Sequence, residues 1–200
     1  MRAFIISGTD TGIGKTIVAA MLTIALGAHY WKPIQSGIED GTDTQRVQAL
    51  TGLSNNRFLR ESYILSRPLS PHRAAELDGT EIGKIFLPKM GGTLIIEGVG
   101  GLMVPVTRRK LQIDVFKEWA MPVILCASTK LGTINHTLLS IEALHKRKIV
   151  LHGLIFIGQD AGTVGQLYLD GDDHLLHPAG ADGQVRLLLA GSSIGIGHFS

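Results

Sequence analysis

A glycine-rich stretch near the N-terminus is the clearest sign of chemistry in the chain. It runs from Gly8 to Thr16 with the sequence GTDTGIGKT, after one apolar run and before another. A strand, a glycine-rich turn and a helix in this order form a phosphate-binding loop, because glycines let backbone N–H groups converge on one anion and the helix turns its positive end to the same point. Lys15 would neutralise terminal phosphates, and the Thr16 hydroxyl suits Mg²⁺.

The loop departs from the usual spacing at its start. Thr9 stands where such loops have their first glycine, and Gly8 comes one residue earlier. A flexible turn before an ordinary helix is therefore an alternative explanation. Gly-Lys-Thr at a strand-to-helix junction nevertheless favours phosphate binding.

Further charged residues stand near the ends of expected strands, where ligands bind in parallel sheets. Glu97 closes the apolar strand Thr93–Glu97 and is followed by glycines that break it. A divalent cation would offset the cost of burying this carboxylate, and the alternative is a strand-end residue that faces water. Lys32 precedes Pro33 at another strand end, which favours a place in the site over the usual solvated lysine. Asp43 could cap a helix, a role compatible with a place in the site.

The elements that must position these residues alternate between strands and helices. This pattern predicts an α/β fold, a doubly wound and mostly parallel sheet flanked by helices. Arg2–Ser7 does not alternate between apolar and polar residues, so we expect a strand buried on both faces. The other expected strands are His29–Pro33, Glu61–Leu65, Thr93–Glu97, Met121–Ala127 and Val150–Ile157. The expected helices are Thr16–Gly27, Asp43–Leu50, Arg73–Leu77, Ile82–Leu87, Ile113–Trp119 and Thr133–Arg147, with loops over Gln35–Thr42 and Gly52–Arg60.

The pattern stops after Ile157. Residues 158–200 are rich in glycine, and Val185–Ala190 is their one convincing apolar run. Because no linker precedes this segment, we expect residues 1–200 to form a single domain with an atypical end. His174 and His177 lie close together there, but their glycine-rich surroundings argue against a metal site.

Composition excludes several classes of function. The chain has 200 residues, of which 44% are hydrophobic and 18% charged, as in globular proteins. Its 19 basic and 17 acidic residues form no long basic run, so nucleic acid is not an expected partner. Cys126, the only cysteine, lies in an apolar run, which predicts a buried strand residue and a reducing compartment. We find no signal peptide and no apolar stretch long enough to span a membrane, and we expect a cytoplasmic protein with no membrane partner.

The phosphate-binding loop resembles that of the dethiobiotin synthetase family, including the displaced first glycine. Further family-like stretches follow in the family's order. They are Lys32–Gly37, Thr42-Asp43, Pro68–His72, Glu97–Gly101 and Lys130–His136. The resemblance extends from residue 1 to about residue 157. The ordered set of motifs is far more specific than any one of them.

The resemblance implies an ATP-dependent ligase of biotin synthesis. Such enzymes convert 7,8-diaminononanoate, CO₂ and ATP, with Mg²⁺, to dethiobiotin, ADP and phosphate. One amine captures CO₂ as a carbamate, and the carbamate attacks the γ-phosphate to give a mixed anhydride. The second amine then closes the cyclic urea and expels phosphate.

The resemblance also implies roles for individual residues. Lys32 and Lys15 are the expected catalytic residues, and Thr16, Asp43 and Glu97 would hold Mg²⁺ directly or through water. The residues expected to bind ATP are Gly12, Ile13, Gly14, Lys15, Thr16, Ile17, Asp43, Glu97, Gly98, Val99 and Gly100. Thr11 and Ser36 would bind the diamine or carbamate end of the substrate. Gly132, Thr133 and Asn135 of a partner subunit would bind its carboxylate, which implies a homodimer with shared active sites; an ordinary helix start is the alternative.

The chain departs from the family after the strand Val150–Ile157. The family has an Asn-Asp pair there that helps to bind adenine, whereas this chain has Ile157-Gly158, with Gln159 as a candidate. A partitioning-type ATPase switch is one alternative function, although the loop lacks the extra lysine of that class. A cobyrinate amidase or related ligase would need a glutamine-handling domain, for which no residues remain. A catalytically impaired relative of dethiobiotin synthetase is the last alternative.

Overall fold

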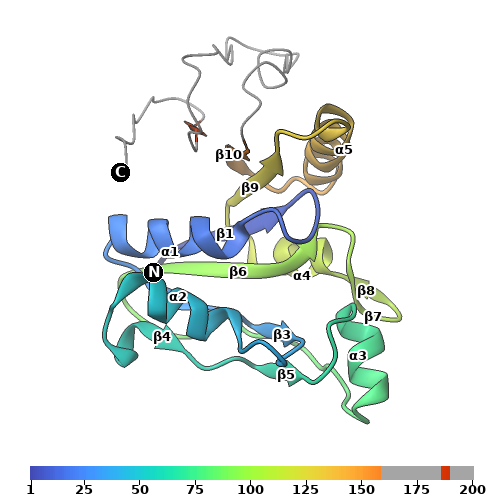
Figure 1. The fold of residues 1–200 in the computed structure, drawn as a ribbon. Coiled ribbons are helices and arrows are strands. Elements are labelled where there is room, and N and C mark those ends of the chain that lie inside the picture. The colour runs from blue at the N-terminus through green and yellow to red at the C-terminus, as the bar shows by residue number, and fades with distance from the viewer. Residues whose placement is uncertain (159–185, 190–200) are drawn as a thin grey trace.

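The computed structural model describes residues 1–158 and 186–189, and a seven-stranded sheet runs through it (Figure 1). The order of its strands is β11-β10-β9-β1-β6-β2-β4. All neighbouring strands pair in parallel except β10 and β11, which are antiparallel. The strands are β1 (Arg2–Gly8), β2 (His29–Trp31), β4 (Phe58–Leu59), β6 (Thr93–Gly101), β9 (Val123–Ser128), β10 (Leu151–Ile157) and β11 (Arg186–Leu189). The predicted doubly wound, mostly parallel sheet is therefore confirmed.

Two short strand pairs lie outside this sheet. β3 (Ile34–Ser36) pairs in parallel with β5 (Tyr63–Leu65), and β7 (Pro105–Thr107) pairs antiparallel with β8 (Lys110–Leu111). β3 continues the chain beyond β2, and its residues Gln35 and Ser36 form part of the wall of the site described below.

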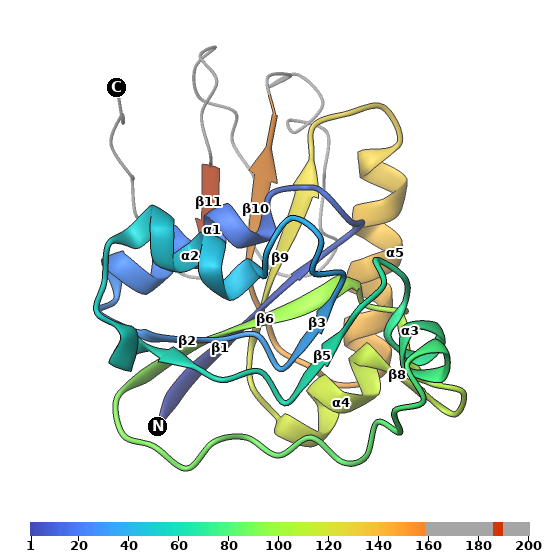
Figure 2. The same cartoon turned by 60° about the horizontal axis from the view of Figure 1, so that its bottom comes forward.

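Helices cover both faces of the sheet (Figure 2). They are α1 (Lys15–Ala25), α2 (Asp43–Thr51), α3 (Pro71–Leu77), α4 (Gln112–Trp119) and α5 (Thr133–Lys146), with a 3₁₀ turn at Asn55–Arg57. Alternate residues of β1 point to opposite faces. Phe4 and Ile6 pack with α1 and α2, whereas Ala3 and Ile5 belong to the cluster that includes α3, α4 and α5. Every residue of β1 after Arg2 is buried, as its unbroken apolar sequence predicts.

The order of the strands reverses around β1. From β1 the sheet continues through β6 and β2 on one side and through β9 and β10 on the other. Such a reversal opens a crevice at the carboxyl ends of the strands. The phosphate-binding loop follows β1, and Lys32 follows β2, at this same edge.

Several expected elements differ from the observed ones. The predicted helix at Ile82–Leu87 is wrong: the segment is irregular, but Ile82 and Ile85 are buried and the Trp119 indole donates to the Ile85 carbonyl at 2.9 Å. β6 does not stop at Glu97 but continues through the glycines, where Gly101 pairs with Gly8. The expected loops at Gln35–Thr42 and Gly52–Arg60 contain part of β3 and all of β4, strands too short to show a periodicity.

Other expectations concern burial and the end of the chain. Cys126 is buried in β9, as predicted, and burial raises the pKa of its thiol to about 12. Among the described residues, each helix is either too short or too polar to cross a bilayer. Gln159, His174 and His177 lie outside the described residues.

Candidate active site

The phosphate-binding loop depends on glycine at three positions. Gly12 and Gly14 have φ angles of 66° and 94°, in the left-handed region that glycine adopts freely. At the displaced Gly8, a Cβ would lie 2.6 Å from the Ile13 Cδ1 atom and 2.9 Å from the Asp10 carbonyl oxygen. The loop therefore needs a glycine at Gly8.

The phosphate-binding loop presents backbone N–H groups at the N-terminus of α1. Gly14 is the N-cap of α1 and supplies no side chain, so the N–H groups of the first turn are available to an anion. Lys15 donates from Nζ to the Asp10 carbonyl at 2.8 Å, which folds its side chain back along the loop. Burial, and then the charge of Lys32, lowers the pKa of Lys15.

Glu97 is the centre of a hydrogen-bonded network at the end of the loop. Its Oε1 atom accepts from Thr16 Oγ1 at 2.9 Å and from Lys32 Nζ at 3.1 Å, and its Oε2 atom accepts from the Tyr30 hydroxyl at 2.7 Å. The Lys32 ammonium also lies 2.8 Å from Asp43 Oδ2. Glu97 is only 1% exposed and lies inside β6, so the alternative of a water-facing residue at a strand end is wrong.

The charges in this network stabilise one another. Burial by itself would lower the pKa of Lys32, but the charges of Glu97 and Asp43 outweigh it and raise that pKa, so the ammonium stays protonated. Burial and then Glu97 raise the pKa of Tyr30 well above its ordinary value, so its hydroxyl is a neutral donor. The result is a pair of carboxylates held around a buried cation.

Asp43 is free to join the network because another residue caps its helix. Thr42 Oγ1 accepts from the Gln45 backbone N–H at 3.2 Å, and the Gln45 side chain accepts from the Thr42 N–H at 2.8 Å. The backbone N–H of Asp43 donates to Gln35 Oε1 at 3.0 Å. The Asp43 carboxylate is thereby left to face Lys32, with Arg46 3.7 Å away on the solvent side.

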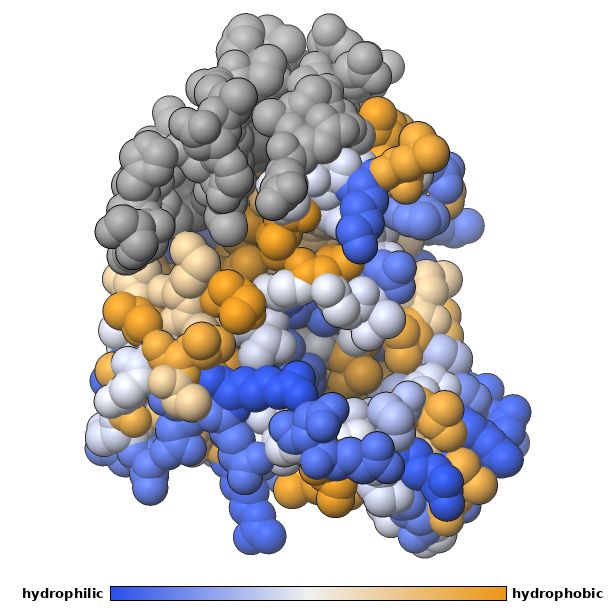
Figure 3. Space-filling model, viewed as in Figure 1, coloured by the Kyte–Doolittle hydropathy of each residue, from blue (hydrophilic) through white to orange (hydrophobic). Residues whose placement is uncertain are grey.

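These residues line a pocket of about 350 Å³. The expected site residues in its wall are Thr11, Gly12, Gly14, Lys15, Thr16, Lys32, Ser36, Asp43, Glu97, Val99 and Gly100. Of the other expected residues, Gly98 accepts a hydrogen bond at its carbonyl oxygen from Lys32 Nζ at 3.1 Å. Ile13 packs on the apolar core instead, and Ile17 of α1 is half-exposed. Hydrophobic side chains gather on the surface over α1 (Figure 3).

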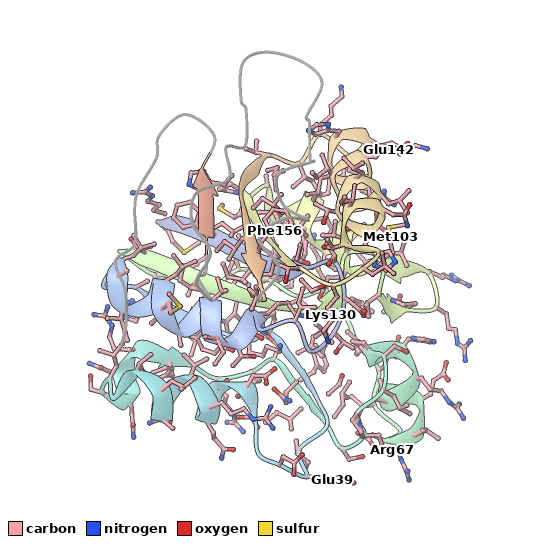
Figure 4. The ribbon with its side chains drawn as sticks, turned by 45° about the horizontal axis from the view of Figure 1, so that its top comes forward. Glu39, Arg67, Met103, Lys130, Glu142 and Phe156 are labelled. Atoms are coloured by element: carbon pink, nitrogen blue, oxygen red, sulfur yellow. The ribbon has the colours of Figure 1, made fainter. Side chains whose placement is uncertain are left out.

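The expected carboxylate-binding residues are placed differently. Gly132, Thr133 and Asn135 are absent from the described residues that line the pocket. They begin α5, after the loop that holds Lys130 (Figure 4). Asn135 is exposed, whereas Thr133 is buried with its hydroxyl unpartnered within the described chain. The single chain therefore does not bring them to the site.

Sequence reasoning missed several residues in and around the pocket, among them Tyr30, Gln35, Arg46 and Gln112. Tyr30 could have been found, because the expected strand His29–Pro33 places it two residues before Lys32 and so on the same face. In the structure β2 ends at Trp31, and the side chains of Tyr30 and Lys32 both reach Glu97. Gln112 had no such signal. Its side chain accepts from the Val99 N–H at 2.5 Å and donates to the Gly101 carbonyl at 2.9 Å, and so braces the glycine-rich end of β6 from α4.

The donor set fits a magnesium ion that is shared with phosphate. The Thr16 hydroxyl and the carboxylates of Asp43 and Glu97 are hard oxygen ligands beside the phosphate-binding loop. Within the described residues, no three His, Cys, Asp or Glu side chains form a metal cluster. Mg²⁺ is typically held by one or two carboxylates together with substrate phosphates and water, which is the arrangement these residues could complete.

Comparison with known proteins shows the family. A family model described as an AAA domain matches residues 2–181. The ATP-dependent dethiobiotin synthetase of Agrobacterium fabrum is 57% identical over 159 residues, which cover 78% of this chain and 75% of that protein. A Rhodopseudomonas palustris protein of the same name is 49% identical over 186 residues, covering 92% of this chain and 84% of its own.

The chain belongs to the dethiobiotin synthetase family. Membership makes it an ATP-dependent ligase that forms carbon–nitrogen bonds, with a role in biotin biosynthesis. The resemblance noted in the sequence is therefore confirmed. Among solved structures, a ParA family ATPase from Chlorobium tepidum overlaps with a TM-score of 0.41 at 12% identity, covering 80% of this chain and 74% of that one. So distant a likeness says nothing about function.

Proposed function

We propose that this member of the dethiobiotin synthetase family converts 7,8-diaminononanoate, CO₂ and ATP to dethiobiotin, ADP and phosphate. The observation that supports this most strongly is the convergence of Thr16, Lys32, Asp43 and Glu97 in one pocket beside the phosphate-binding loop. Its place of action would be the cytoplasm.

The reaction needs positioning more than covalent help from the protein. One amine attacks CO₂ and loses a proton to give a carbamate. A carbamate oxygen attacks the γ-phosphorus, and ADP leaves. The second amine attacks the carbonyl carbon of the mixed anhydride, phosphate leaves, and loss of a proton completes the cyclic urea.

Lys32 and Lys15 are the catalytic residues in this scheme. Carbamate and γ-phosphate are both anions, and a buried cation between them lowers their repulsion as charge moves. Lys32 suits this role because its neighbours keep it protonated. Lys15 and the N–H groups of the loop, from Gly12 to Ile17, would hold the phosphates. Gly98, Val99 and Gly100 would complete the wall around the nucleotide.

Thr16, Asp43 and Glu97 would hold Mg²⁺, which when bound neutralises charge on the phosphate oxygens. The Asp43 and Glu97 carboxylates already lie 2.8 Å and 3.1 Å from the Lys32 ammonium, so binding the ion would require little rearrangement of the protein.

The diamine end of the substrate would meet Thr11 and Ser36. Both line the pocket, and the Ser36 hydroxyl is buried with no hydrogen-bond partner in the described chain. The substrate carboxylate would be bound by Gly132, Thr133 and Asn135 of a second subunit, at the N-terminus of α5. This arrangement implies a homodimer with shared sites.

The deciding experiment measures ADP release from Mg²⁺-ATP and bicarbonate, with and without 7,8-diaminononanoate. Diamine-dependent release together with a product of dethiobiotin mass is the expected result. ADP release at the same rate with and without the diamine would indicate a partitioning-type ATPase switch instead. ATP binding without any release would indicate a catalytically impaired relative.

A further inference from the structure

Tyr30 is fully buried on β2, beneath the pocket rather than in its wall. It is paired in register with Ile95 of β6, and Glu97 lies two residues further along that strand. Since alternate residues of a strand share a face, Tyr30 and Glu97 both point to the side covered by α1 and α2. The tyrosine ring packs at a tilt against Phe58 of β4, with 6.2 Å between the ring centroids.

Packing alone does not account for the tyrosine hydroxyl. A phenylalanine would fill the same apolar space, and a buried hydroxyl is costly unless it is bonded. The hydroxyl instead donates at 2.7 Å to Glu97 Oε2, the oxygen that neither Thr16 nor Lys32 contacts. With both oxygens bonded, the plane of the carboxylate is fixed, and Oε1 is directed at Thr16 and Lys32.

We propose that Tyr30 is a positioning residue that orients the Glu97 carboxylate for Mg²⁺. The inference rests on the proposed role of Glu97 as a metal ligand. Hydrogen-bond partners behind a ligating carboxylate set its orientation and basicity, and their loss typically weakens metal affinity or activity about 10-fold to 100-fold. Tyr30 would thus influence a reaction whose substrates it does not touch.

The test compares Tyr30→Phe with a matched control, Tyr63→Phe. Tyr63 lies on β5 outside the pocket, and its hydroxyl accepts from the Gly83 N–H at 3.0 Å, so the control removes the same atom from a bond unconnected with Glu97. The readout is the dissociation constant of a non-hydrolysable ATP analogue, measured with Mg²⁺ and with EDTA. The ratio of the two constants gives the contribution of Mg²⁺ to binding.

Tyr30→Phe should reduce this ratio about 10-fold and leave the affinity in EDTA within about twofold of wild type. Tyr63→Phe should leave both values unchanged. In the Glu97→Gln background, Tyr30→Phe should have no further effect, because the two residues act through one interaction. A thermal melt of each variant checks that it is folded.

Two results would overturn the inference. One is an unchanged ratio in folded Tyr30→Phe protein, which would leave the hydroxyl a purely structural role. The other is a wild-type protein whose nucleotide affinity does not respond to Mg²⁺, which would remove the metal role of Glu97 as well. Diamine-dependent ADP release by the wild type tests the ligase reaction separately from both.

Discussion

The proposed active site has two parts, the region around the phosphate-binding loop and the start of α5. They differ in how many of their polar groups find partners within one chain. Around the phosphate-binding loop, the buried charges of Lys32 and Glu97 find all their partners within the chain. At the start of α5, Leu131 is fully exposed and Thr133 has a buried hydroxyl without a partner in the described chain. The first region is a closed network of charges. The second, which comprises Leu131 to Asn135 at the start of α5, is called the open end below.

This difference separates the two tasks of the proposed reaction. Phosphoryl transfer depends on charges fixed in advance, and a network within one chain can provide them. Recognition of the substrate carboxylate would fall to the open end, which a second copy of the chain would bring to the pocket. We therefore expect mutations in the first region to slow the chemistry, and mutations in the second to weaken substrate binding.

The largest expected effect comes from Lys32→Ala. Loss of one preorganised charge should lower kcat by about 100-fold or more. The measurement is diamine-dependent ADP release at saturating substrates, with exposed Lys84→Ala as the control because Lys84 lies outside the pocket. A Lys32→Ala enzyme within about threefold of wild type would remove this residue from the mechanism.

The next prediction tests the open end. Asn135→Ala should raise KM for the diamine about 10-fold or more, as expected for losing a hydrogen bond to a charged group, and should change kcat less. At diamine concentrations well below the KM of the Asn135→Ala variant, co-expression of Lys32→Ala and Asn135→Ala subunits should restore about a quarter of wild-type activity, because half of the dimers are mixed and each has one intact shared site. Mixed preparations no more active than the separate variants would contradict shared sites.

Much of the first region could be predicted from sequence, because its geometry follows from general rules. The carboxyl ends of parallel strands meet at one edge, so the loop after β1, Lys32 after β2 and Glu97 of β6 had to lie close together. Asp43 joins them from the start of α2. Chain order and strand periodicity suffice for such an inference.

The rest depends on contacts that no local pattern encodes. Tyr30 reaches Glu97 because of the register between β2 and β6, and Gln112 reaches β6 from another helix. Ile82 and Ile85 have the spacing of a helix face, but tertiary packing buries them in an irregular segment. Glycines after Glu97 suggested a strand end, whereas pairing with β1 carries the strand onward.

A smaller effect is expected at the brace between α4 and β6. Gln112→Leu would leave the Val99 N–H and the Gly101 carbonyl without their partner and should reduce the free energy of unfolding by about 1–3 kcal/mol. Because Val99 lines the pocket, KM for ATP should also rise by a few-fold. Urea unfolding and steady-state kinetics measure the two effects. Gln48→Leu, outside the pocket on α2, serves as the control; equal effects of the two variants would argue against a specific brace.

The smallest effect is expected at the C-terminal end of α5. An ion pair between Arg147 and Asp114 of α4 holds this end, in contrast to the exposed start of the helix. The Asp114 carboxylate accepts from Arg147 Nε at 3.0 Å and from the Leu111 N–H at 3.1 Å. Burial acts to raise the pKa of Asp114, but the hydrogen bonds from Arg147 and Leu111 outweigh it and lower that pKa. The ionised carboxylate therefore stabilises the fold above the unfolded-state pKa of about 4, and this contribution is lost as the pH falls through the lower folded-state value.

Asp114→Asn should thus cost no more than about 1 kcal/mol at pH 7, since the ion pair is partly exposed to solvent. Its difference from wild type should shrink as the pH drops below about 4. Urea unfolding at several pH values measures this. Glu142→Gln, on the outer face of the same helix (Figure 4), is the matched control. A difference of the same size at pH 7 and at pH 3 would mean that the charge of Asp114 does not hold this end of α5, and that the two ends of the helix differ less than their contacts indicate.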